Sequence, residues 1–90
     1  MRITTNIFGP DITLKEELIL DASSITLRDV VKAILSKRES ALDQIVKNDL
    51  SLENGCVALV NGRNILSLEN LDTRIHDGDE ITFTVLLAGG

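Results

Sequence analysis

Basic stripes, long apolar runs and paired cysteines are missing from this sequence. Lysine and arginine number 9 against 14 acidic residues, for a net charge of −5, and they form no basic stripe. The chain therefore offers nothing for a nucleic-acid backbone, and its acidity suits basic surfaces of partner proteins. Cys56 is the single cysteine, which excludes an internal disulfide and fits a reducing compartment. Because the apolar runs are also too short for a bilayer, we predict a cytoplasmic protein that binds neither nucleic acid nor membrane.

Side chains that commonly carry catalysis are scarce as well. The single histidine, His76, stands beside aspartates in the segment 76–79, where a glycine favours a solvated turn over a His–Asp catalytic pair. Cys56 opens an apolar run, which favours a core thiol over a nucleophile. The acidic residues of 77–80 lack the spacing of a calcium loop. We predict that the chain is no enzyme on its own and binds no metal or cofactor itself.

Alternating side chains predict β-strands at both ends of the chain. Residues 2–8 and 12–20 alternate on either side of Gly9-Pro10-Asp11, which has the composition of a turn. They are expected to form an antiparallel hairpin. Residues 80–87 alternate most regularly, which predicts a central strand.

The middle of the chain predicts shorter strands. The apolar run 56–60 is typical of a buried strand, and Asn61-Gly62 after it is a strong signal for a hairpin turn. Residues 64–66 would be the return strand, and Ser67–Thr73 a loop or a single turn. Residues 40–50 have only rough helical spacing and predict a short helix or an irregular connection.

One helix is predicted between these two groups of strands. Apolar residues recur there at i, i+3, i+4, i+7 and i+8, which places one apolar stripe along a helix. Thr26 is placed to be the N-cap, and Asp29 three residues later completes a pattern like a capping box. The stripe consists of Leu27, Val30, Val31, Ile34 and Leu35.

This order of elements favours an α+β domain in which the helix packs on one face of a mixed sheet. With the final strand beside the first, the arrangement is a β-grasp, and the five expected strands, numbered along the chain, have the order 2-1-5-3-4. A β-meander would leave the helix stripe without a shared sheet. We expect the β-grasp domain to span residues 1–87 and to carry a flexible tail at 88–90.

Four short motifs resemble those of the ubiquitin-like sulfur carriers. They are Val60-Asn61-Gly62, Leu71-Asp72-Thr73, the run from Ile75 to Ile81 that contains Gly78-Asp79-Glu80, and Ala88-Gly89-Gly90. That family includes the small subunit of molybdopterin synthase (MoaD-like) and the sulfur carrier of the thiamine pathway (ThiS-like). Leu86-Leu87 stands where molybdopterin-synthase small subunits often have two prolines. The general carrier resemblance does not depend on those prolines.

The resemblance implies a reaction at the end of the chain. A partner enzyme of the ubiquitin-activating type would use Mg-ATP to adenylate Gly90, and sulfur would then replace AMP to leave a thiocarboxylate. A thin Ala88-Gly89 segment could thread into a narrow channel of that partner. The sulfur would pass to an acceptor enzyme such as the large subunit of molybdopterin synthase, or toward thiamine or tRNA thiolation.

Apolar residues near the tail are candidates for docking the partner. Phe8 lies opposite the core-facing set of its strand, as does Leu86, with Leu87 next to it, and exposed apolar patches commonly mark partner surfaces. Two other functions stay open. The chain could be a protein modifier that Gly90 joins to target lysines, or an interaction domain whose tail is incidental.

Overall fold

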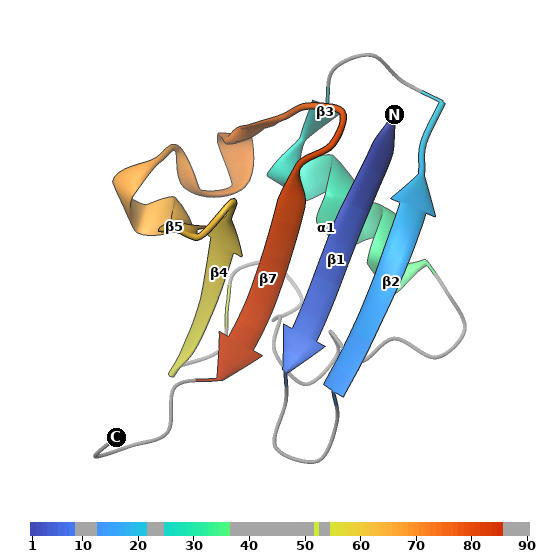
Figure 1. Ribbon diagram of the computed structural model, residues 1–90. Helices are drawn as coiled ribbons and strands as arrows, with labels where there is room; N and C mark the ends of the chain where they lie inside the picture. The colour runs from blue at the N-terminus through green and yellow to red at the C-terminus, as the bar shows by residue number, and fades with distance from the viewer. Residues whose placement is uncertain (9–12, 22–24, 37–51, 53–54, 86–90) are drawn as a thin grey trace.

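The described part of the chain forms a mixed sheet with one α-helix across a single face (Figure 1). The computed structural model describes residues 1–8, 13–21, 25–36, 52 and 55–85. The sheet has five strands in the order β2-β1-β7-β4-β5, and a second, two-stranded sheet pairs β3 with β6. The strands are β1 (Arg2–Phe8), β2 (Thr13–Ile19), β3 (Ile25–Thr26), β4 (Cys56–Val60), β5 (Arg63–Asn64), β6 (Arg74–Ile75) and β7 (Glu80–Val85); the helix is α1 (Leu27–Leu35).

The last described strand lies in the middle of the sheet, between the first strand and β4. β7 runs parallel to β1, with Thr5 opposite Ile81 and Ile7 opposite Phe83, and antiparallel to β4. A parallel pair needs a long crossover, which the chain supplies through α1 and the segments after it. The predicted β-grasp and its strand order are confirmed, because 2-1-5-3-4 corresponds to β2-β1-β7-β4-β5.

The helix begins where the sequence predicts. The Thr26 hydroxyl accepts a hydrogen bond from the Asp29 N–H at 3.4 Å, and the Asp29 carboxylate accepts one from the Thr26 N–H at 3.1 Å. This is a complete capping box. The hydrogen bonds from Thr26, that of its backbone N–H first, lower the pKa of Asp29 below its usual value.

The helix stripe and the inner face of the sheet share one aliphatic core. Phe83, at the centre of β7, is only 1% exposed. Leu35, the last residue of the predicted stripe, is half-buried. The buried apolar residues are Ile3, Ile7, Leu18, Leu27, Val30, Val31, Ile34, Ala58, Val60, Ile65, Ile75, Ile81 and Phe83.

Two details differ from the sequence-based expectation, the return strand and a pair of very short strands. The return strand is only Arg63–Asn64, because the Asn64 side chain accepts a hydrogen bond from the Leu66 N–H at 2.9 Å and starts a 3₁₀ turn, η2, over Ile65–Ser67. A second 3₁₀ turn, η3 (Asn70–Asp72), lies within Ser67–Thr73, where a loop or a single turn was expected. The β3–β6 pair was not predicted, since strands of two residues show no alternation. The prediction for residues 40–50 lies outside the described residues.

Candidate functional site

β7 ends at Val85, and in the sequence the predicted tail at 88–90 follows after Leu86-Leu87. Val85 lies opposite Cys56 of β4, and Thr84 lies opposite Phe8 of β1. The predicted docking residue Phe8 therefore lies at the end of the sheet from which the chain continues toward Gly90. The predicted site residues Leu86, Leu87, Ala88, Gly89 and Gly90 lie outside the described residues.

The face of the sheet opposite α1, here called the outer face, carries apolar side chains near that end. Phe8 is 41% exposed, and Val57 and Leu59 of β4 are half-buried. In the register, Thr84 stands between Phe8 and Val57. No helix or strand of the described chain covers this face (Figure 1).

Sequence reasoning missed Val57 and Leu59. The run 56–60 is apolar throughout and suggested a strand buried on both faces, whereas only Ala58 and Val60 of β4 are buried. The alternation of side chains across a strand could have assigned Val57 and Leu59 to the face opposite that of Phe83. Cys56 is half-buried and packs against the core, so the predicted core position holds in part.

A buried asparagine, Asn6, forms hydrogen bonds to side chains in the middle of the outer face. Asn6 is only 7% exposed, and its Nδ2 donates to Glu80 Oε2 at 2.9 Å and to Thr82 Oγ1 at 3.2 Å. The amide nitrogen must face Glu80, because a carboxylate oxygen can only accept. Asn6 thus orients a carboxylate on the exposed side of the sheet.

The two central motifs of the resemblance contact each other. Asn61 Oδ1 accepts from the Glu80 N–H at 2.9 Å, and Asn61 Nδ2 donates to Asp79 Oδ1 at 3.0 Å. The Asn61 N–H also donates to the Glu80 carbonyl at 2.7 Å. Asn61 has φ 52°, and Gly62 follows at φ 84°, the left-handed conformations that a tight hairpin requires. The Val-Asn-Gly turn therefore fixes the start of β7.

The segment around His76 is a structural turn. Gly78 has φ 88°, and the Asp79 carboxylate accepts the His76 N–H at 2.8 Å. The His76 ring lies farther away, with 3.8 Å between Nδ1 and Asp79 Oδ2. Asp77 Oδ1 accepts the Arg2 N–H at 2.6 Å. Both aspartates accept hydrogen bonds from backbone N–H groups, which favours the predicted turn over a catalytic pair.

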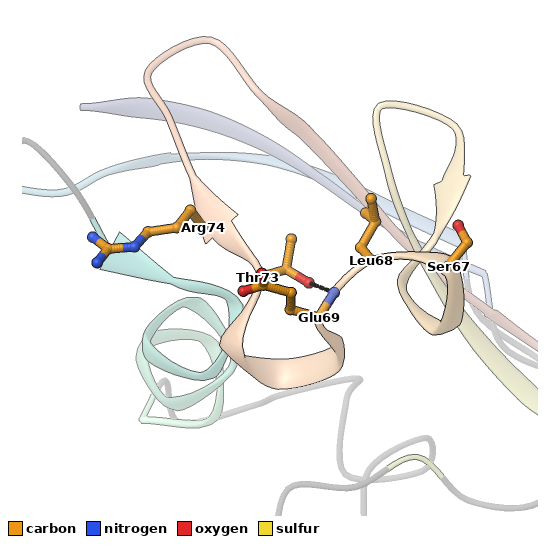
Figure 2. Close-up of a pocket in the computed structure, with 5 residues that line it drawn as sticks. All are labelled: Ser67, Leu68, Glu69, Thr73 and Arg74. Atoms are coloured by element: carbon orange, nitrogen blue, oxygen red, sulfur yellow. Dashed lines mark hydrogen bonds between the residues drawn. The ribbon is translucent and has the colours of Figure 1, made fainter.

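A shallow pocket lies beside the 3₁₀ turns η2 and η3 (Figure 2). Its central hydroxyl, Thr73 Oγ1, accepts the Glu69 N–H at 3.0 Å and donates to the Asn70 carbonyl at 2.7 Å. Both hydrogen bonds of this hydroxyl are therefore made within the loop. It is lined by Ser67, Leu68, Glu69, Thr73 and Arg74. Across the described ranges, no three His, Cys, Asp or Glu side chains gather as metal ligands, and no helix could cross a membrane.

Comparison with known families matches residues 6–90 to the ThiS family. The chain belongs to the ThiS family. It is 31% identical over 74 residues, 82% of this chain and 84% of the other, to an Archaeoglobus fulgidus protein named "Putative sulfur carrier protein". A member of this family is a small ubiquitin-like sulfur carrier and does not catalyse on its own.

Solved structures show the same fold as this ThiS-family chain. SAMP1 of Haloferax volcanii, a small archaeal modifier protein, is 18% identical, superposes with a TM-score of 0.76 and matches 100% of both chains. A chain from the complex of subunits 1 and 2 of the Helicobacter pylori molybdopterin-converting factor is 20% identical, with a TM-score of 0.63 and 100% of both chains covered. At these identities the likeness concerns the fold.

Proposed function

We propose that Gly90 of this sulfur carrier is adenylated by an enzyme of the ubiquitin-activating type and is then converted to a thiocarboxylate. The observation that supports this most directly is the position of β7. This strand lies centrally in the sheet and ends at Val85, beside the outer-face residue Phe8, shortly before Ala88-Gly89-Gly90. A rigid body of this kind can present the tail to a partner's active site.

Activation by ATP solves a chemical problem at the carboxylate. A free carboxylate resists nucleophiles because of its negative charge, and an oxide is a poor leaving group. Transfer of AMP to the Gly90 carboxylate neutralises that charge and supplies a good leaving group. The terminal sulfur of an enzyme persulfide then attacks the acyl carbon and displaces AMP to give an acyl disulfide. A second thiol of the persulfide donor reduces the S–S bond, which releases the thiocarboxylate and leaves a disulfide on the donor. In this proposal Mg-ATP is bound by the activating partner and not by this chain, and the protein works in the cytoplasm.

The acceptor of the sulfur belongs to cofactor biosynthesis. We favour molybdopterin, with the large subunit of molybdopterin synthase as the second partner, since a chain of the Helicobacter pylori molybdopterin-converting factor complex has this fold. The same thiocarboxylate chemistry could donate sulfur in thiamine biosynthesis or in the thiolation of tRNA. The family match to ThiS fits the thiamine branch.

The outer face near the tail would dock these partners. Phe8 is the described member of the predicted docking set, and Leu86 and Leu87 follow Val85 directly in the sequence. Val57 and Leu59 extend the apolar surface across β4. Apolar contact beside the tail would hold Ala88 and Gly89 at the entrance of the partner's channel.

A second function is favoured by the likeness to SAMP1, which is named a modifier protein. There Gly90 would form an isopeptide bond with a lysine of a target. The two functions share the adenylation step and diverge afterwards.

Intact mass spectrometry separates these functions. The chain is incubated with the activating enzyme of its own organism, Mg-ATP and a persulfide donor, and then with a lysate. Sulfur carriage predicts a monomer in which one oxygen is replaced by sulfur. Modification predicts adducts of the mass of whole proteins, whereas an unchanged mass under both conditions contradicts activation at Gly90.

A further inference from the structure

Glu80 is an exposed carboxylate whose orientation is fixed. It opens β7 on the outer face, and one of its oxygens accepts the Asn6 Nδ2 hydrogen bond at 2.9 Å. Asn6 is itself nearly buried, so the donor has little freedom to move. Both backbone groups of Glu80 are bonded to Asn61, the N–H at 2.9 Å and the carbonyl at 2.7 Å. Main chain and side chain are thus both restrained.

No lysine or arginine within the described part of the chain pairs with Glu80. Arg2, on the neighbouring strand β1, instead places Nε 2.6 Å from the carboxylate of Glu17. Thr4 stands opposite Glu80 in the register between β1 and β7. Among the described residues, the Glu80 charge therefore faces outward with no lysine or arginine beside it.

We propose that Glu80 is a second anchor for the activating enzyme and receives an arginine guanidinium of that partner. A guanidinium binds a carboxylate through a planar fork of donors, and a carboxylate held in place loses less side-chain entropy on binding. Because the anchor serves the activating enzyme, it rests on the function proposed above.

The register sets where the anchor lies relative to the apolar docking surface. Glu80 pairs with Thr4, and Thr84 pairs with Phe8. Four residues of strand separate the two rows, a distance of about 13 Å at roughly 3.3 Å per residue. The enzyme thus carries an apolar site at its tail channel and an arginine about 13 Å from it along the strand direction. Two separated contacts of different kinds fix the orientation in which the tail enters.

The test replaces the charge and keeps the hydrogen bond. Glu80→Gln retains a carbonyl oxygen that accepts from Asn6, so the fold and the melting temperature stay as in the wild type. Glu69→Gln is the matched control, because Glu69 is also exposed but lies between η2 and η3. The probe is the activating enzyme of the chain's own organism, and KM for the chain is measured by ATP–pyrophosphate exchange at several salt concentrations.

The anchor predicts that Glu80→Gln raises KM about tenfold, leaves kcat unchanged and flattens the salt dependence of kcat/KM. Glu69→Gln stays within about twofold of the wild type. Equal KM values and equal salt slopes for the two variants would overturn the anchor. Wild-type exchange in the same assay reports the proposed function separately, so loss of the anchor and loss of the function give different results.

Discussion

The two ends of β7 are held in different ways. At Glu80, side chains from two other parts of the chain fix the strand, Asn6 from β1 and Asn61 from the hairpin turn. At Val85, the strand is held through its ladder with β1 and β4, next to Phe8 and Cys56. The motifs Val-Asn-Gly and Gly-Asp-Glu therefore restrain one end of β7, whereas the other end continues in the sequence toward the tail.

Both ends depend on the core beneath them, and this dependence gives the largest expected effect on stability. Ile34 of α1 is 4% exposed and belongs to the core cluster with Phe83. Ile34→Ala removes packed methylene groups and should lower the free energy of unfolding by about 2–5 kcal/mol. Urea unfolding measures this, and a loss below about half a kcal/mol would show that the helix stripe does not pack as described.

The restraint at the Glu80 end can be removed on its own. Asn61→Gly deletes the side-chain hydrogen bonds to Glu80 and Asp79, yet glycine keeps the left-handed φ of 52° without strain. We expect the free energy of unfolding to fall by about 1–2 kcal/mol. Thr84→Val, a matched change at the tail end, should cost less than about half a kcal/mol. A larger loss of stability for Thr84→Val than for Asn61→Gly would contradict the proposed difference between the two ends of β7.

The tail end should matter more for binding than for stability. Phe8→Asp places a charge in the exposed apolar surface and should raise the Kd for the activating enzyme about tenfold, with a near-native melting curve. Leu66→Asp is the control, because Leu66 is 75% exposed but lies on η2, outside the outer face. If both variants bind as tightly as the wild type, the apolar surface around Phe8 is not a docking site.

The smallest effect concerns the cap of α1, whose hydrogen bonds join Thr26 and Asp29 and do not involve β7. Thr26→Ala should lower the free energy of unfolding by about 1 kcal/mol, because the first turn loses its hydroxyl acceptor. The capping hydrogen bonds lower the pKa of Asp29 from its usual 3.8. Asp29 therefore adds stability above that pH and loses it as the pH falls through the lowered value. Urea unfolding of Asp29→Asn should match wild type only in strong acid, and a constant difference across pH would contradict this.

Periodicity was enough to predict most of the fold. The Leu27–Leu35 stripe, the N-terminal hairpin and the last strand are set by local patterns of apolar residues, so their packing against one another followed. The return strand was misplaced because one hydrogen bond, from the Leu66 N–H to the Asn64 side chain, starts a 3₁₀ turn. Two-residue strands such as β3 and β6 give no periodic signal at all.

The candidate site was predicted only in part. Phe8 was placed on the outer face because it lies opposite the core-facing set of its strand, and its ring is indeed exposed. Its docking role stays a prediction. The roles of Asn6 and Asn61 depend on contacts with residues that lie more than eighteen positions away or on different strands. A local sequence pattern gives no sign of such contacts. Predictions for residues 86–90 stay predictions, because that segment lies outside the described residues.

The central claim is that Gly90 carries the reacting carboxylate, and the length of the tail tests it most directly. Deleting Gly90, or adding one residue after it, moves the end of the chain by about 3.5 Å. A displacement of about 1 Å can already cost a reaction a hundredfold. ATP–pyrophosphate exchange with the activating enzyme should therefore vanish for both variants, while urea unfolding stays as in the wild type. Wild-type exchange rates for the extended chain, without prior trimming, would contradict the assignment of Gly90.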